Sequence, residues 1–167
     1  MISANRDLGK IVYVAFLDVR KCFNSIWHDG LLYTLMCANV SPRITLILRN
    51  LYREFNVKVK IPNELSRNGK IEQGLKQGCV LSTCLLVLFM DDKIKAIQKE
   101  GIGAAIGHRR VGIIAYADDE GLIAIDPAEL QRLLDIAYKH SCLWRYGYNV
   151  AKCKVLVYGG PLTLYTL

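Results

Sequence analysis

The sequence lacks the closely spaced cysteine pairs from which zinc ribbons and short disulfide frameworks are built. Its six cysteines are Cys22, Cys37, Cys79, Cys84, Cys142 and Cys153, and no two of them form a C-x-x-C pair. We therefore expect reduced, buried thiols. The three histidines, His28, His108 and His140, are far apart and show no metal-ligand spacing, so they are assigned no catalytic role.

The sequence also lacks an apolar run long enough to cross a bilayer. The longest uncharged apolar run, residues 79–90, has 12 residues, whereas a membrane-spanning helix needs roughly 20; it predicts a buried helix. Residues 1–10 carry charges at Arg6, Asp7 and Lys10 and no apolar core, so no secretory signal is visible. These absences predict an intracellular protein of the nucleus or cytoplasm that is neither secreted nor bound to a membrane.

What the sequence does contain is enough apolar material for one sizeable core. Hydrophobic residues make up 52% of the 167 residues, which excludes a disordered chain and predicts a single domain over residues 1–167. Twenty-two Lys and Arg against 15 Asp and Glu give a formal charge of +7. Such a balance attracts polyanions such as nucleic acid, although a basic domain that binds none is an equally good reading of composition alone.

Apolar periodicity and turn residues predict an alternation of strands and helices. The expected elements are a buried strand over residues 11–17, helices over 29–38 and 42–55, a half-buried strand over 56–61, a helix over 80–100, strands over 111–115 and 122–125, a helix over 126–146 and a strand over 154–158, followed by an undistinguished tail. This order indicates an α+β fold, an antiparallel sheet with helices on one face.

Two places in this scheme concentrate carboxylates. Asp118 and Asp119 are adjacent at the expected turn between two strands, and Asp18 directly follows the first strand. Neighbouring carboxylates repel each other unless a cation neutralises them, and oxygen-only ligands suit Mg²⁺. An Asp-Asp pair alone is more often an ordinary turn. Adjacent strands, however, could gather all three aspartates into a two-metal site for phosphoryl transfer.

Four segments resemble, in order, the palm motifs of reverse transcriptases. They are Phe16-Leu-Asp-Val-Arg-Lys-Cys-Phe23, Gly74-Leu-Lys-Gln-Gly-Cys-Val-Leu-Ser82, Tyr116-Ala-Asp-Asp119 and Gly147-Tyr-Asn-Val-Ala-Lys152. Together they extend over nearly the whole chain. The Gln-Gly-Cys-x-Leu-Ser form of the second segment resembles the LINE-type, non-LTR retrotransposon branch rather than group II intron, retroviral or telomerase enzymes. The resemblance implies a palm-like α+β fold with partial fingers.

The same resemblance implies a role for each motif residue. Asp18 and Asp118 would hold Mg²⁺, or Mn²⁺ as a substitute, with help from the Val19 carbonyl and from Asp119. Lys152 would protonate the leaving pyrophosphate, and Tyr116 would lie under the primer terminus. Phe23 would act as the steric gate against ribonucleotides, while Gln77 and Gly78 would pack on the incoming nucleotide. From residue type alone, Phe23 is a core aromatic, the 77–78 loop a simple turn and Lys152 a surface lysine.

Cations elsewhere could contact nucleic acid, because phosphate neutralisation supplies most sequence-independent affinity. The candidates for a template or primer path are Arg43, Arg49, Arg53, Lys58 and Lys60, with Arg109 and Arg110 as a second group. The implied partners are an RNA template, a DNA primer, deoxynucleoside triphosphates and the rest of a retrotransposon polyprotein.

The sequence departs from the family pattern at Asn24, Thr83 and the Glu120-Gly121 pair. Glu120 is expected to add negative charge beside the site, and Gly121 to weaken the returning strand. Fingers motifs before Ile11, and a thumb, endonuclease or zinc knuckle after Leu167, are missing from the sequence, which predicts a fragment. Two hypotheses follow: an RNA-directed DNA polymerase domain, and an inactive remnant that only binds nucleic acid.

Overall fold

The computed structural model describes residues 11–159 and 163–166. The chain divides into two compact units, one formed by residues 1–21 with 90–167 and the other by residues 22–89. The segment 1–10, in which no secretory signal was expected, lies outside the described residues. The expectation of a single domain stays a prediction.

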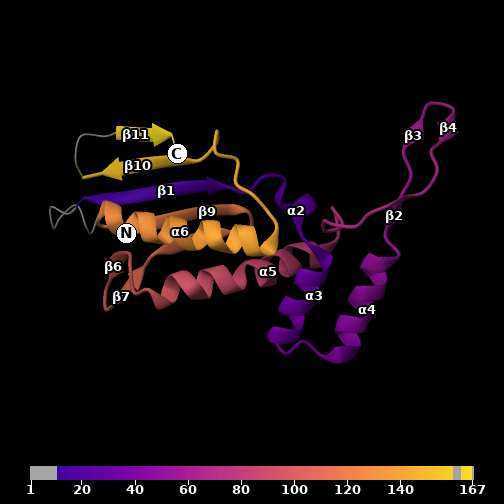
Figure 1. Cartoon of the computed structure of the whole chain (residues 1–167), viewed down its shortest axis with the longest axis horizontal. Helices are drawn as coiled ribbons and strands as arrows, with labels where there is room; N and C mark the ends of the chain where they lie inside the picture. Colours follow the sequence, from indigo (N-terminus) through magenta and orange to yellow (C-terminus); the bar gives the residue numbers. More distant parts are fainter. Residues whose placement is uncertain (1–10, 160–162, 167) are drawn as a thin grey trace. The chain divides into compact units, whose positions relative to one another are not determined.

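The first unit is built on a five-stranded sheet with the strand order β11-β10-β1-β9-β8 (Figure 1). All neighbouring strands are antiparallel. The strands are β1 (Val12–Asp18), β8 (Ile113–Tyr116), β9 (Asp119–Ala124), β10 (Lys154–Tyr158) and β11 (Thr163–Thr166). β1 is central, with β9 on one side and β10 on the other. The expected strand is therefore present and central, but the expectation that it is buried throughout was wrong, because Phe16 is half exposed.

One face of this sheet is covered by helices, and this is where the main core lies. Ala15 and Leu17 of β1 and Leu122 of β9 pack with Ile97 of α5 (Val80–Lys99) and Leu133 of α6 (Pro127–Trp144). α6 begins where Asp126 accepts hydrogen bonds from the backbone N–H groups of residues 128 and 129, as an N-cap does. The expected α+β fold, with helices on one face of an antiparallel sheet, is confirmed.

The second unit contains α2 (Cys22–Ser25), α3 (His28–Cys37), α4 (Pro42–Arg53) and the first half of α5. The prediction of one half-buried strand over residues 56–61 was wrong. The chain instead makes β2 (Asn56–Val57), which pairs with β5 (Gly69–Lys70), and β3 (Lys60–Ile61), which pairs with β4 (Glu64–Leu65). Both sides of these strands are exposed, so alternation here did not indicate a buried face.

Two further expectations need correction. The tail was thought undistinguished, but β11 pairs with β10, and an unexpected hairpin joins β6 (Ala104–Ile106) to β7 (Arg109–Val111). The apolar run 79–90 is buried on one side only, since Val80 and Leu81 are exposed. Of the thiols, those of Cys37, Cys84 and Cys142 are exposed rather than buried. Within the described residues, no helix is long and apolar enough to span a membrane.

Candidate active site

The carboxylates expected to act together meet at one end of the β1–β9 ladder. Asp18, the last residue of β1, is the direct cross-strand partner of Asp119, the first residue of β9. Residues directly opposite in an antiparallel pair have Cα atoms about 4.5–5.5 Å apart. The register therefore brings these two aspartates together, although 100 residues separate them along the chain.

Asp118 lies in the turn of the β8–β9 hairpin. Tyr116 and Asp119 are the last paired residues of the two strands, so Ala117 and Asp118 form a two-residue loop. Ala117 has a φ of 55°, a left-handed conformation that L-residues rarely adopt. The tight turn expected from the sequence is present, but both strands extend further into it than predicted, and Asp119 belongs to the strand rather than to the turn.

Lys152 is held beside Asp18 by the segment that connects α6 to β10. The Asn149 N–H donates to the Asp18 carbonyl over 2.8 Å, and the Arg20 N–H donates to the Gly147 carbonyl over 2.8 Å. Tyr148 forms an isolated β-bridge with Val19. The result is an ion pair in which the Lys152 Nζ lies 3.6 Å from the Asp18 Oδ1. Two motifs far apart in sequence are thus placed side by side.

The face of the sheet opposite the helices is hollowed in front of these residues. The hollow has a volume of about 650 Å³ and includes Asp18, Asp119 and Lys152 among its lining. Its floor is apolar, with Phe16 and Ile114 both about half exposed and Tyr116 exposed by 84%. The Tyr116 ring therefore lies largely in solvent, among the residues that line the hollow.

The residues at this edge fit a hard cation in chemistry, but they do not form a closed cage. Across residues 11–159 and 163–166, no three His, Cys, Asp or Glu side chains are arranged to hold a metal ion. Asp18 and Asp119 supply oxygen donors on the open face of the sheet. Mg²⁺ is commonly bound through one or two carboxylates together with substrate phosphates and water, so an incomplete protein ligand set is compatible with it.

Glu120 was expected to add negative charge beside the site, and this was wrong. Strand residues alternate between faces, so Glu120 points away from Asp119 and into the helix-covered side, where only 1% of its side chain is exposed. There its Oε1 accepts from the Nζ of Lys93 on α5, a side chain that is fully buried. The negative charge is therefore compensated inside the protein.

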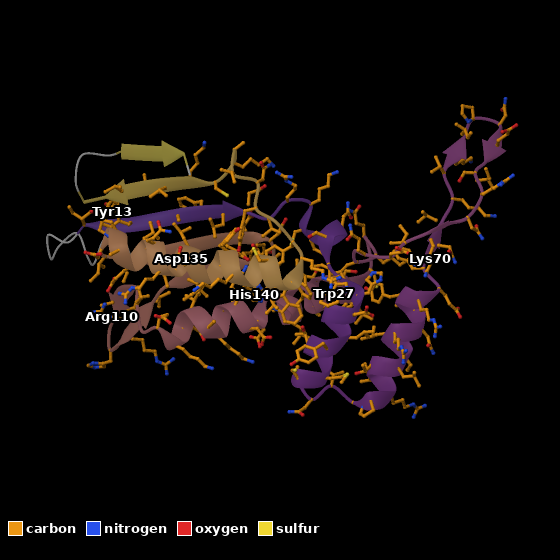
Figure 2. The ribbon with its side chains drawn as sticks, in the orientation of Figure 1. Tyr13, Trp27, Lys70, Arg110, Asp135 and His140 are labelled. Carbon is orange, nitrogen blue, oxygen red and sulfur yellow. The ribbon has the colours of Figure 1, made fainter. Side chains whose placement is uncertain are left out.

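Two tyrosines and a histidine complete this buried cluster. The Lys93 Nζ lies 3.1 Å from the Tyr146 hydroxyl and 3.3 Å from the Tyr148 hydroxyl. Burial, reinforced by the Glu120 charge, raises the pKa of Tyr148 far above its ordinary value, so its hydroxyl stays protonated and donates to Glu120. Burial, followed by the positive charge of Lys93, lowers the pKa of His140 on α6 to about 3 (Figure 2). His140 is accordingly neutral at physiological pH.

Lys93, Glu120 and their partners were not predicted from the sequence. The sequence did contain a signal for Glu120. It lies two residues before Leu122 and four before Ala124, so all three share one face of β9, and all three are buried. A second was available for Lys93, which lies four residues from Phe89 and four from Ile97, both fully buried. A charged residue at a core position of each element indicates that the charge needs a buried partner, although the pattern does not say which one.

Of the five residues expected to bind the nucleotide, the second unit contains Phe23, Gln77 and Gly78, and the first unit contains Tyr116 and Lys152. The Leu75 N–H donates to the Phe23 carbonyl over 2.6 Å, and the Gly74 N–H donates to the Ile26 carbonyl over 2.8 Å. The Gln77 amide lies 3.3 Å from the Asn24 side-chain oxygen. Phe23 is partly exposed, and a Cβ added at Gly78 would meet nothing within 4 Å. The open surroundings leave room for a ligand, and the assigned roles stay predictions.

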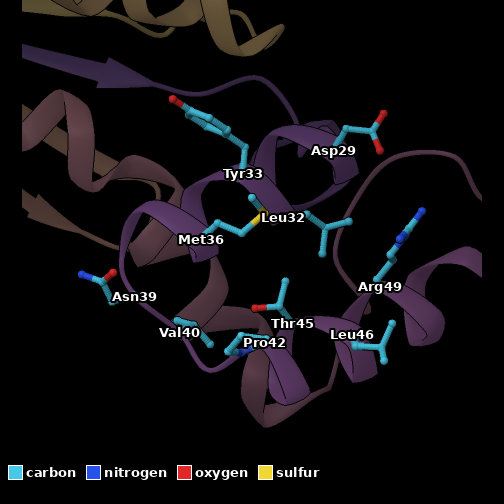
Figure 3. Close-up of a pocket in the computed structure, with 10 residues that line it drawn as sticks. All are labelled: Asp29, Leu32, Tyr33, Met36, Asn39, Val40, Pro42, Thr45, Leu46 and Arg49. Atoms are coloured by element: carbon cyan, nitrogen blue, oxygen red, sulfur yellow. The ribbon is translucent and has the colours of Figure 1, made fainter.

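The cations expected to follow a template also lie in this unit, and all of them are exposed. They are Arg43, Arg49, Arg53, Lys58 and Lys60. Arg49 borders a hollow of about 700 Å³ between α3 and α4. Figure 3 shows the residues that line it, among them the apolar Leu32, Met36 and Leu46. This hollow lacks a group of carboxylates and is not a candidate catalytic centre.

Comparison with known proteins shows which family the chain resembles. Residues 2–161 match the family described as reverse transcriptase (RNA-dependent DNA polymerase). The chain is 30% identical over 140 residues to the Retrovirus-related Pol polyprotein from type-1 retrotransposable element R2 of Bradysia coprophila, covering 81% of this chain and 15% of that protein. It is 26% identical over 144 residues to the RNA-directed DNA polymerase from mobile element jockey of Drosophila funebris, covering 83% and 15% respectively.

Among solved structures, apo telomerase from Candida tropicalis matches with a TM-score of 0.75 at 11% identity, over 97% of this chain and 31% of that one. A likeness at this identity speaks for the fold alone. The chain spans about a sixth of the length of the two retrotransposon proteins named above. The family match covers nearly all of the sequence and includes all four motifs. The chain therefore belongs to the reverse transcriptase (RNA-dependent DNA polymerase) family, and its retrotransposon relatives place it in the LINE-type, non-LTR branch.

Proposed function

We propose that this chain is the catalytic palm, with partial fingers, of an RNA-directed DNA polymerase that transfers deoxynucleotides to the 3′-hydroxyl of a DNA primer on an RNA template. The observation that carries the proposal is the meeting of Asp18 and Asp119 at one edge of the sheet, with Lys152 3.6 Å from Asp18. A cation at this carboxylate pair and a proton donor beside it are the parts that nucleotidyl transfer requires.

Asp18, Asp118 and Asp119, with the Val19 carbonyl, would hold Mg²⁺ or Mn²⁺. The bound metal would activate the primer hydroxyl and stabilise the charge that develops on the leaving pyrophosphate. Lys152 would donate a proton to that pyrophosphate. Its ion pair with Asp18 keeps the ammonium at the site before substrate arrives. The exposed ring of Tyr116 would support the primer terminus.

The second unit would supply nucleotide selection and the path of the template. Phe23 would exclude ribonucleotides, and Gln77 and Gly78 would pack on the incoming nucleotide. The exposed Arg43, Arg49, Arg53, Lys58 and Lys60 would neutralise backbone phosphates. These substrates would place the reaction in the nucleus or cytoplasm, within a larger retrotransposon polyprotein.

The test is primer extension by the purified chain on an RNA template, with Mg²⁺ and with Mn²⁺. The essential variant is Asp118→Asn with Asp119→Asn. Its matched control is Asp91→Asn with Asp92→Asn, which removes an identical Asp-Asp pair from α5. Extension by the native chain and by the control, but not by the essential variant, supports the proposal.

Lysine roles can be separated in the same assay. Lys152→Met should slow extension by about a hundredfold, in the range of general acid catalysis. Lys154→Met removes a lysine two residues away, at the start of β10, and should leave the rate nearly unchanged. If no variant or native sample extends the primer while RNA binding persists, the chain is a nucleic-acid-binding remnant instead.

A further inference from the structure

Directly behind the turn that carries the aspartates, the protein buries an ion pair. Glu120 follows Asp119 along β9, and its carboxylate pairs with the Lys93 ammonium in a region where neither side chain is exposed by more than 1%. Taking two charges out of water costs several kcal/mol per ion, and apolar residues of similar volume would often be no less stable. Stability alone therefore does not account for these two residues.

The position of the pair suggests what it does instead. Through Glu120, the Lys93 ammonium is joined to the strand that begins with Asp119. Through the Tyr148 hydroxyl, 3.3 Å away, it is joined to the segment that connects α6 to β10. The Tyr148 hydroxyl also donates to the Glu120 Oε2 over 3.5 Å. One ammonium therefore contacts both structures that border the candidate site.

The second of these structures fixes Asp18. Tyr148 bridges to Val19, and the backbone N–H of the next residue, Asn149, donates to the Asp18 carbonyl over 2.8 Å. Lys152 lies in the same segment. A displacement of Tyr148 would thus move Asp18 and Lys152 together, while a displacement of Glu120 would move Asp119. Because Lys93 contacts both Glu120 and Tyr148, it couples these two displacements.

We infer that Lys93 is a positioning residue, which acts through Glu120 and Tyr148 to hold Asp18 and the Asp118–Asp119 turn at the separation that binds a divalent cation. The inference rests on the proposed function, because it needs the three aspartates to be metal ligands. The cluster differs from a simple core contact because it links β9, which carries Asp119, to the segment between α6 and β10, which contacts Asp18. Residues that orient metal ligands typically change metal affinity by 10–100-fold when they are replaced.

The decisive variant replaces both charges, Lys93→Met with Glu120→Met, so that no ion is left buried without a partner. The probe is Mn²⁺, titrated against the full chain and followed by electron paramagnetic resonance. We expect about a tenfold weaker affinity for the variant, with its melting temperature close to that of the native chain. Amide exchange of the turn around residues 116–119 should also quicken, since the turn loses its anchor.

The matched control is Ile97→Val, one turn further along α5 and equally buried. It should lower the melting temperature, because it leaves a small cavity in the core, and leave the Mn²⁺ affinity unchanged. Should the double variant fail to fold, Tyr148→Phe removes only the bridging hydroxyl and should weaken Mn²⁺ binding in the same direction. A folded double variant, or a folded Tyr148→Phe variant, with native Mn²⁺ affinity and native exchange of the turn would overturn the inference.

The proposed function fails by a different result in the same titration. If Asp118→Asn with Asp119→Asn binds Mn²⁺ as tightly as the native chain, the aspartates are not the metal site, and the positioning role is overturned with it. If that variant loses binding while the Lys93→Met, Glu120→Met variant keeps it, the metal site stands and only the role of Lys93 is refuted.

Discussion

Asp18 and Asp119 face each other as the final pair of the β1–β9 ladder. Like charges directly opposite each other across antiparallel strands are destabilising, by roughly 0.2–1 kcal/mol. We therefore predict that Asp119→Asn raises the free energy of unfolding by an amount in this range when no divalent cation is present. Urea unfolding in buffer with a chelator measures the difference. Asp92→Asn, an exposed change on α5, is the control and should show no such gain.

When Mg²⁺ or Mn²⁺ is added, we expect the native chain to become more stable than the Asp119→Asn variant. A ligand that binds only the folded state at 100 times its dissociation constant adds about 2.7 kcal/mol, and Asp119→Asn removes part of the site. The native chain should therefore gain more stability from the cation than the variant. Equal gains in both proteins would mean that this carboxylate pair does not hold the cation.

The aspartate pair was predictable because it depends on strands, whose ends the sequence marks clearly. The run 12–17 is apolar and ends at a charge, and the apolar residues 122–124 begin just after the Asp-Asp pair. The cross-strand register was not predictable, since it depends on turn geometry. The sequence predicted a tight turn between residues 115 and 122 but not its length, whereas Ala117 adopts a positive φ and closes a loop of two residues.

The parts missed from sequence share a physical cause. The β6–β7 hairpin, which turns at Gly107, has strands of three residues, and these are too short to show periodicity. Gly101 and Gly103, which precede it, indicated only the end of a helix. The Lys93–Glu120 pair depends on tertiary packing between α5 and β9. No local pattern specifies which buried charge finds which partner.

Ala117 stores strain in the turn between β8 and β9. An L-residue in the left-handed region costs roughly 1–2 kcal/mol, and glycine avoids that cost because it has no Cβ. We predict that Ala117→Gly stabilises the fold by up to about 1 kcal/mol, because the left-handed strain that it removes exceeds the extra backbone entropy that glycine loses on folding. Ala115→Gly, two residues earlier in β8, should have the opposite sign, a loss of about 0.5–1 kcal/mol. A loss of stability at both positions, in thermal unfolding, would show that residue 117 is not strained.

Two glycines of the second motif make a matched pair in the other unit. Gly74 and Gly78 both have positive φ, 97° and 79°, but a Cβ at Gly74 would lie 2.9 Å from the Asn24 Cα, whereas one at Gly78 would meet nothing within 4 Å. Gly74→Ala should therefore destabilise the chain clearly more than Gly78→Ala, which bears only the backbone cost. Urea midpoints of the two variants measure this, and equal midpoints would contradict the close approach of the Gly74 and Asn24 backbones.

His140 should make the protein sensitive to mild acid. Its pKa is lowered from 6.5 to about 3, first by burial and then by the Lys93 charge. Between these values the unfolded chain binds a proton that the folded chain does not. The free energy of unfolding therefore falls as the pH falls below about 6.5, by at most about 1.4 kcal/mol per pH unit. Above that pH the group is neutral in both states and contributes no slope.

The window from pH 6.5 to 5 reports on histidines rather than carboxylates, because ordinary Asp and Glu side chains are still mostly ionised there. His140→Phe keeps a ring beside Trp144 and Tyr146, which the native imidazole contacts, but it cannot titrate. The variant should be less stable than the native chain at pH 7, since it loses the 2.9 Å contact to the Tyr146 hydroxyl. Its stability should nonetheless change little between pH 6.5 and 5. His108→Gln, in the exposed β6–β7 turn, should keep the native slope. A native slope in His140→Phe would mean that another group takes up the proton on unfolding.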